Sequence, residues 1–232
     1  MTGFSDQSIA LRLAAVRERV AAAAVAAGRD PAEIRIVGVS KRQPLASVRA
    51  ALAAGLEDFG ENFLQEALEK MDGLGPSPAR WHFIGALQSN KTAAVAERFD
   101  WVHSVDRAKL AERLSRQRPA ALPPLNVCVQ VQIGDEDSKA GAAPGEAGDL
   151  ARRVAALPGL RLRGLMAIPP PETDPARQRA WCRQLAALHA QLRAGGLALD
   201  TLSMGMSDDL EAAVAEGANL VRIGTAIFGP RS

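Results

Sequence analysis

The sequence predicts an α/β protein in which eight parallel strands close into a (β/α)8 barrel of the TIM type, with an extra helix before the first strand. Two observations carry this prediction. Strand-like and helix-like segments alternate along the whole chain, and the loops between them are short. The 232 residues also suit one barrel of roughly 250 residues. An open doubly wound sheet is the alternative, but it normally contains fewer strands. We expect residues 1–232 to form a single domain.

The chain begins with an alanine-rich segment, residues 1–30, whose apolar pattern contains Arg12, Arg17, Glu18 and Arg19. These charges interrupt the apolar core that a signal peptide needs, so the segment predicts an amphipathic helix. No run of eighteen apolar residues, the signature of a membrane-spanning helix, occurs in the sequence.

The remaining elements follow in β/α pairs. Strands are predicted at 34–40, 56–62, 80–85, 100–106, 125–133, 160–168, 199–205 and 219–224. Helices are predicted at 45–55, 63–73, 89–99, 107–117, 145–157, 174–196 and 207–217, with a short helical turn after the last strand. The strands are rich in Val, Ile and Leu, as buried parallel strands are, and the helices are amphipathic.

Composition excludes several classes of function. Apolar residues make up 47% and charged residues 23% of the chain, which is typical of a globular protein. The formal net charge is only +2, and the basic residues are scattered. We therefore expect no nucleic-acid or membrane partner. Cys128 and Cys182 lack the paired spacing of a metal or redox site, and they indicate a reducing, cytoplasmic compartment.

Lys41 follows the first predicted strand directly, in "EIRIVGVSKRQP", residues 33–44. Barrel enzymes carry their chemistry at the carboxyl ends of the strands. A lysine there is either a solvated strand terminator, a counter-charge for a bound anion, or an amine that forms a Schiff base. The chain contains only five lysines, so retention of one at a strand end favours amine chemistry.

A second anchor lies at the far end of the chain, in residues 202–229. "MGMS" and "RIGT" place small residues at two strand-to-helix junctions, where backbone amides approach anions closely. Gly205, Met206, Ser207, Gly224 and Thr225 are therefore candidate phosphate ligands, although a role as plain turns is equally compatible with the pattern. Closure of the barrel would bring the last strand, and this cradle, beside Lys41.

Other candidates have weaker support. His82 and His103 lie within strand patterns without an obvious partner, so a structural role is favoured over acid–base chemistry. Asp135, Glu136 and Asp137 resemble an oxygen-ligand site for a hard cation, but adjacent acidic residues in a loop are usually solvated. We predict no metal site.

Seven ordered motifs between residues 34 and 229 resemble the pyridoxal 5′-phosphate (PLP) homeostasis protein family, single-barrel relatives of the alanine racemase N-terminal domain. They read "VGVSKRQP", "FGENFLQEALEK", "WHFIGALQSNK", "VHSVDR", "GDEDSKAG", "RGLMAIPP" and "LSMGMSDDLEAAVAEGANLVRIGTAIFG". Ala86 replaces the commoner proline of the third motif, in a loop. The resemblance implies one PLP molecule at the barrel mouth.

The resemblance also implies roles for individual residues. Lys41 falls where the family forms the internal aldimine with PLP, and Asn62 falls near the 3′-oxygen of the ring. Ser207, Gly224 and Thr225 fall on the phosphate positions. Arg222 falls opposite the pyridine nitrogen. Met166 and Met204, at two strand ends, fall near the ring.

Three hypotheses of function follow. The first is a PLP-binding protein, not an enzyme, that serves PLP homeostasis and amino- and keto-acid balance and transiently meets apo-enzymes. The second is a PLP-dependent amino-acid racemase. Arg222 opposes protonation of the ring nitrogen, and the chain has no tyrosine to act as a second base, which disfavours catalysis. The third is a cofactor-free, aldolase-like Schiff-base enzyme.

Overall fold

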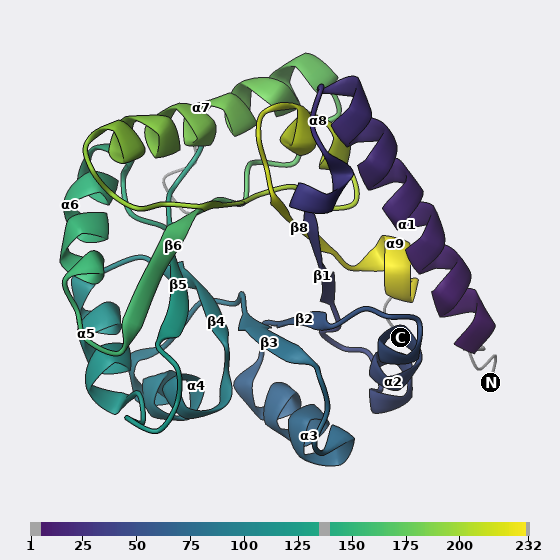
Figure 1. Cartoon of the computed structure of the whole chain (residues 1–232), viewed down its shortest axis with the longest axis horizontal. Helices are drawn as coiled ribbons and strands as arrows, with labels where there is room; N and C mark the ends of the chain where they lie inside the picture. The colour runs from purple at the N-terminus through teal and green to yellow at the C-terminus, as the bar shows by residue number, and fades with distance from the viewer. Residues whose placement is uncertain (1–5, 135–139, 231–232) are drawn as a thin grey trace.

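The computed structural model describes residues 6–134 and 140–230, and in these ranges eight parallel strands close into a barrel in sequence order. The strands are β1 (Arg35–Val39), β2 (Asp58–Glu61), β3 (Arg80–Phe83), β4 (Trp101–Val105), β5 (Leu125–Gln130), β6 (Leu160–Met166), β7 (Thr201–Ser203) and β8 (Leu220–Ile223). Figure 1 shows them as the central ring of the molecule. The predicted (β/α)8 fold is confirmed.

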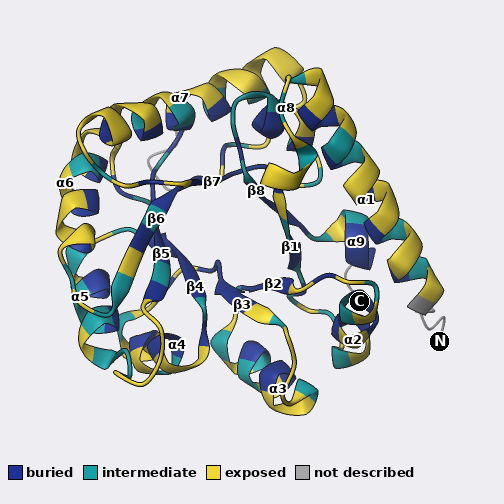
Figure 2. Ribbon diagram, viewed as in Figure 1, coloured by how far each residue is buried: buried dark blue, intermediate teal, exposed yellow. Residues whose placement is uncertain are grey.

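Helices surround the ring and expose their outer faces. They are α1 (Asp6–Ala26), α2 (Leu45–Ala53), α3 (Leu64–Leu74), α4 (Thr92–Arg98), α5 (Ala108–Gln117), α6 (Pro144–Ala155), α7 (Pro175–Ala194), α8 (Leu210–Ala215) and α9 (Thr225–Phe228), with 3-10 turns η1 (Pro31–Glu33) and η2 (Ser89–Lys91). The helical sides that face the strands are buried (Figure 2). The main apolar core therefore lies between the strands and the helical shell.

The predicted extra helix is α1, which lies against the outside of the barrel. It packs on α2, α8 and α9 (Figure 1), and its buried side includes Ile9, Leu13, Val16 and Val20. The spacing of three or four residues between these side chains is that of one helical face. This helix thereby joins the elements at the start and end of the barrel.

Barrel closure occurs between β1 and β8. The register pairs Arg35 with Leu220 and Gly38 with Ile223. The segments that follow these two strands begin at Ser40 and Gly224, so the carboxyl ends of the first and last strands lie side by side. This is the neighbourhood that the sequence predicts for Lys41 and the "RIGT" turn.

The end of β7 and the start of the helix that follows it both differ from their predicted positions. The strand ends at Ser203, two residues early, and Gly205 then adopts a left-handed backbone with φ +94°. The following helix starts at Leu210 and not at Ser207, because the Met206 amide first donates to the Asp209 carboxylate at 2.6 Å. Residues 204–209 therefore form a turn at the barrel mouth.

The barrel interior contains polar as well as apolar side chains. Barrels of this type are ordinarily filled by branched apolar side chains. Here Trp101, Cys128 and Met166 form a small apolar cluster separate from the main core, and His82 and His103 pack beside Trp101. The interior thus carries polar groups between the two ends of the barrel.

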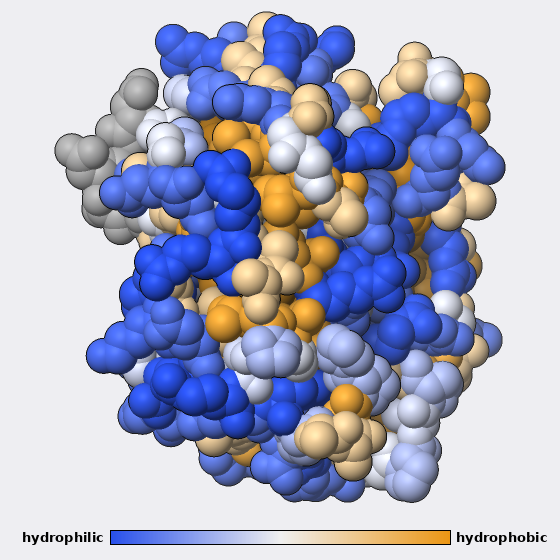
Figure 3. All heavy atoms as spheres, turned by 60° about the vertical axis from the view of Figure 1, so that its left-hand side comes forward, coloured by the Kyte–Doolittle hydropathy of each residue, from blue (hydrophilic) through white to orange (hydrophobic). Residues whose placement is uncertain are grey.

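The face of the molecule in Figure 3 is mostly hydrophilic. Figure 3 brings the side that carries α5 and α6 forward and shows hydrophilic residues around a central band of apolar ones. Among residues 6–134 and 140–230, no helix is long and apolar enough to cross a membrane.

Candidate functional site

A cavity of about 320 Å³ lies at the carboxyl mouth of the barrel, between the ends of the first and last strands. It is lined by Val39, Lys41, Asn62, Ile84, Ile168, Met206, Ser207, Asp208, Arg222, Gly224 and Thr225. Six of the eight residues that the resemblance assigns to a cofactor are among them: Lys41, Asn62, Ser207, Arg222, Gly224 and Thr225. Residues that are far apart in sequence thus meet in one site.

A buried ionic cluster holds the backbone on both sides of Lys41. The Lys70 ammonium donates to the Ser40 carbonyl at 2.6 Å, to Glu61 at 2.7 Å and to Glu66 at 2.6 Å. Glu66 also accepts from the amide of Arg42, a non-glycine residue with a left-handed φ of 58°. Such a conformation persists only when its surroundings impose it. The cluster therefore fixes the loop that presents the lysine.

Glu61 lies at the centre of this cluster and is fully buried. Its Oε1 accepts from Lys70 and from the Ser40 hydroxyl, at 2.7 Å each. Among the described residues, its Oε2 has no hydrogen-bond partner. Burial raises the pKa of the Glu61 carboxyl, against the opposing hydrogen bonds from Lys70 and Ser40. A carboxyl at the end of β2 thereby anchors the loop that follows β1.

Asn62 follows Glu61 and reaches the cavity. Its Oδ1 is buried and, within the described part of the chain, accepts no hydrogen bond. Buried polar atoms are almost always paired, so an acceptor left without a donor indicates a missing partner. An unpartnered acceptor on a residue that lines the cavity fits a polar ligand there, such as PLP.

The opposite side of the cavity is formed by the turns after β7 and β8. A Cβ added at Gly205 would lie 2.6 Å from that of Ala213, so the turn needs glycine for space as well as for its φ. The Arg19 guanidinium donates to the Ser207 carbonyl at 3.0 Å and holds this turn against α1. Ser207 and Thr225 thus present two hydroxyl groups beside Gly224, as an anion site requires.

Arg222 lines the cavity and is buried. One guanidinium nitrogen donates to the Ser203 hydroxyl at 2.7 Å and another donates to the Ala167 carbonyl at 2.8 Å. Burial lowers the pKa of Arg222 to about 10, so the group stays charged at neutral pH. A fixed positive charge therefore lies on the lining of the site.

Two of the predicted residues lie outside this lining. Met166 is fully buried in the interior cluster with Trp101 and Cys128. Met204 is fully buried in the main core. Their approach to a cofactor ring stays a prediction.

Sequence reasoning missed four lining residues: Val39, Ile84, Ile168 and Asp208. The first three lie at strand ends or within two residues of them. That position is a usable signal, because every strand end of a barrel contributes to the same mouth.

The histidines have partners that the sequence did not reveal. His82 contacts Asp58 at 2.8 Å and His103 at 2.9 Å, and His103 contacts the Ser203 hydroxyl at 2.8 Å. No group of three potential metal ligands occurs among the described residues. Asp135, Glu136 and Asp137 lie outside those residues.

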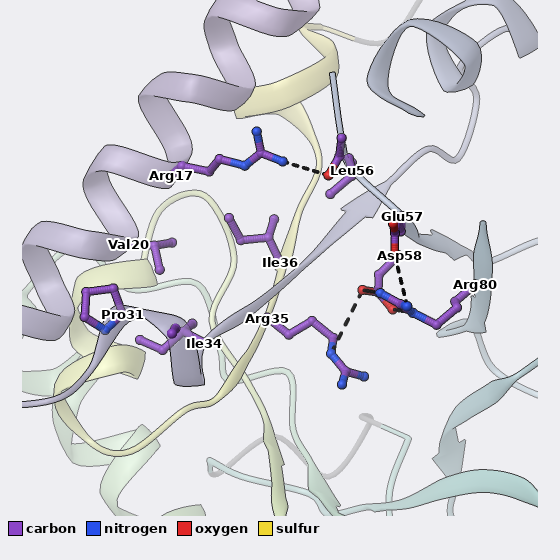
Figure 4. A pocket seen from close by; sticks show the side chains of 12 residues that line it. Arg17, Val20, Pro31, Ile34, Arg35, Ile36, Leu56, Glu57, Asp58 and Arg80 are labelled. Atoms are coloured by element: carbon purple, nitrogen blue, oxygen red, sulfur yellow. Dashed lines mark hydrogen bonds and ion pairs between the residues drawn. The ribbon is translucent and has the colours of Figure 1, made fainter. Parts of the chain in front are cut away.

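A different cavity of about 420 Å³ lies at the amino end of the barrel (Figure 4). Its charged side chains satisfy one another or the backbone. Arg17 donates to the Gly55 carbonyl at 2.8 Å, and Arg80 pairs with both Glu57 and Asp58. This end of a barrel ordinarily serves stability, and its pairing here fits that role.

Comparisons with known proteins identify the family of this chain. Residues 11–232 match the family model for the alanine racemase N-terminal domain. The chain is 59% identical to the pyridoxal phosphate homeostasis protein of Pseudomonas aeruginosa over 224 residues, which cover 97% of this chain and 96% of the relative.

Solved structures of a closer and a more distant relative share the fold of this chain. The structure of PipY from Synechococcus elongatus with PLP bound superposes with a TM-score of 0.84 at 38% identity and covers 95% of this chain and 100% of PipY. Alanine racemase from Corynebacterium glutamicum superposes with a TM-score of 0.73 at 16% identity, over 97% of this chain and 62% of the racemase. At that identity the racemase shows the fold alone.

Proposed function

Because the chain belongs to the pyridoxal phosphate homeostasis protein family, on the alanine racemase N-terminal-domain fold, we propose that it binds PLP at the carboxyl mouth of the barrel and takes part in PLP homeostasis. We propose that residues 1–232 form one PLP-binding barrel domain. The observation that carries it is the cavity itself. It gathers an amine, a buried unpartnered acceptor, a guanidinium and two hydroxyls.

Each end of this cavity matches one part of PLP. The cofactor supplies an aldehyde that condenses with an amine, a pyridine ring and a phosphate. Lys41 holds the cofactor covalently through its amine, because among the described residues no other lysine lines the cavity. Ser207, Gly224 and Thr225 bind the phosphate, and Asn62 lies near the ring's 3′-oxygen. In the proposal Met166 and Met204 support the ring from within the core.

Arg222 directs this site toward holding the cofactor and not toward catalysis. PLP enzymes that need a strong electron sink keep the ring nitrogen protonated beside a carboxylate. A charged guanidinium opposes a second positive charge there. The chain also has no tyrosine. We therefore assign a cofactor-holding role without strong catalytic activity, even though distant relatives of this fold are racemases and aldolases.

The proposed partners follow from this role. They are PLP and, transiently, apo-enzymes that require it, with neither nucleic acid nor membrane. Cys128 and Cys182 are both buried free thiols, which supports the reducing cytoplasmic compartment expected from the sequence.

The direct test is visible absorption of the purified protein after incubation with PLP and removal of excess cofactor. The wild-type protein should retain a visible band, and Lys41→Ala should lack it while keeping the wild-type far-ultraviolet circular dichroism. Lys109→Ala, at an exposed lysine of α5, is the matched control and should keep the band. A band that persists in Lys41→Ala would remove this lysine from the site.

The racemase alternative has its own measurement. Incubation of loaded protein with alanine in deuterated water should give exchange at the α-carbon no faster than free PLP. Rapid exchange that disappears in Lys41→Ala would show that the protein catalyses formation of the carbanion and is therefore an enzyme.

A further inference from the structure

A chain of hydrogen-bonded side chains crosses the barrel interior from one end to the other. Asp58 contacts His82 at 2.8 Å, His82 contacts His103 at 2.9 Å, His103 contacts the Ser203 hydroxyl at 2.8 Å, and Ser203 contacts Arg222 at 2.7 Å. These residues come from β2, β3, β4, β7 and β8. Because β4 and β7 are not neighbours in the closed sheet, the contact between His103 and Ser203 passes through the interior.

The chain is sealed from solvent. All five residues are buried, and the exposed fraction of both imidazoles and of Ser203 is 0%. Trp101 stacks on the His82 ring with a centroid distance of 5.3 Å and an interplanar angle of 10°. In such surroundings each donor must find its acceptor within the chain, since an unpaired polar group is costly to bury.

The two ends fix the direction of every hydrogen bond. Arg222 can only donate, and an ionised Asp58 can only accept. His82 therefore donates from Nε2 to Asp58 and accepts at Nδ1. His103 must then donate from Nε2 to His82 and accept at Nδ1 from the Ser203 hydroxyl. Because the Ser203 hydroxyl donates its only proton to His103, its oxygen accepts from Arg222 through a lone pair.

The charges at the amino end are consistent with this direction. Burial disfavours the charged form of Asp58, but hydrogen bonds from Arg80 and His82 outweigh it and hold the pKa of Asp58 well below its usual range. Burial lowers the pKa of both His82 and His103, so both rings are neutral at pH 7. Figure 4 shows Arg35 and Arg80 on two sides of Asp58.

We infer that Asp58, His82, His103 and Ser203 are positioning residues for Arg222, because the carboxylate of Asp58 selects the imidazole tautomers that turn the Ser203 lone pair toward the guanidinium. The order of the bonds is independent of any ligand. Its consequence for the cofactor rests on the proposed function, in which Arg222 faces the PLP ring. A second proton on His82 would reverse its bond to His103 and the bond from His103 to Ser203, with Nδ1 of each ring as the donor, while His82 Nε2 still donates to Asp58.

The direction of these hydrogen bonds can be measured in the wild-type apo-protein. This measurement does not depend on the folding of any variant. Long-range ¹H–¹⁵N correlation spectra at pH 7.5 distinguish the two neutral tautomers and the imidazolium. The chain contains three histidines, so His189→Gln identifies the third signal. We expect both His82 and His103 as Nε2–H tautomers. A Nδ1–H tautomer or an imidazolium at either ring overturns the inference.

Two variants separate positioning from simple structural support. Asp58→Asn and Arg80→Gln both break the ion pair between Arg80 and Asp58, but only Asp58→Asn removes the charge that selects the tautomers. Asp58→Asn should mix the tautomers and release PLP about tenfold faster, as expected for loss of about one charge-assisted hydrogen bond. Arg80→Gln should keep the wild-type tautomers and release PLP within about twofold of wild type.

Equal tautomer patterns and equal PLP release rates in the two variants would mean that these hydrogen-bonded side chains only support the fold. If wild-type protein retains no PLP, the proposed function fails, yet the tautomer spectra still decide the order of the chain.

Discussion

Lys41 owes its place to a cluster of charges that are not themselves on the cavity lining. Lys70 binds the Ser40 carbonyl on one side of it, and Glu66 binds the Arg42 amide on the other. Arg42 has a φ of 58°, and this conformation costs a non-glycine residue on the order of 1 kcal/mol or more. The hydrogen bonds of the cluster must therefore offset this local strain. The amine is therefore presented by a fixed loop.

Replacement of Lys70 tests this cluster. Lys70→Met leaves the buried Glu61 carboxylate without its cation, and removal of one partner of a buried pair costs about 3–5 kcal/mol. The free energy of unfolding in urea should fall by that amount, while Lys109→Met at an exposed position should leave it unchanged. An unchanged midpoint for Lys70→Met would mean that the cluster does not secure the loop.

The phosphate end of the cavity is tested by removal of two hydroxyls. Ser207 and Thr225 are not buried, so the double variant Ser207→Ala with Thr225→Ala should fold normally. Each hydrogen bond to a charged group contributes about 1.5–3 kcal/mol, so PLP retention on dialysis should fall at least tenfold, with the visible band still formed at high PLP concentration. Wild-type retention would place the phosphate elsewhere.

At the scale of elements, close contacts between neighbouring strand ends shape the cavity. A Cβ added at Gly85, after β3, would lie 2.3 Å from the Asn62 carbonyl oxygen, after β2. Only glycine allows this approach, and it positions the backbone that carries the unpartnered Oδ1 of Asn62. The geometry of the site is therefore a property of strand ends in contact.

Gly85→Ala should displace Asn62 and destabilise the protein by about 1–3 kcal/mol, as overpacking does. It should also weaken PLP retention. Gly145→Ala, in the first turn of α6, meets nothing within 4 Å and should be neutral or slightly stabilising. Thermal unfolding of both variants measures the difference, and equal midpoints would contradict the close contact.

At the scale of the whole molecule, alternation of strand-like and helix-like segments was enough to predict the barrel. That pattern repeats in every β/α unit and depends only on local sequence. The partners inside the barrel were not predictable. His103 and Ser203 are one hundred residues apart and lie on strands that are not neighbours. Their contact depends on closure of the barrel. The sequence pattern alone therefore did not show a partner for either histidine.

The buried histidines make the stability of the whole chain depend on pH. Burial lowers the pKa of His82, His103 and His189 below the usual 6.5, so the unfolded chain binds their protons first as pH falls. The raised pKa of Glu61 acts in the opposite direction, but it offsets only one proton of three.

Stability should therefore be nearly constant above pH 7 and fall by about 1–3 kcal/mol per pH unit between pH 6.5 and 5. Urea unfolding across that range measures the slope. His189→Gln should reduce the slope without abolishing it. A stability that is flat or rises toward pH 5 would show that the interior rings carry protons in the folded state.

Lys41 is proposed to hold PLP covalently at the barrel mouth. Borohydride reduction of the loaded protein, followed by proteolysis and mass mapping, tests it most directly because reduction makes the link permanent. We expect one equivalent of reduced cofactor on the peptide that contains Lys41. Modification of Lys139 or another lysine in its place, or no modification at all, would contradict it.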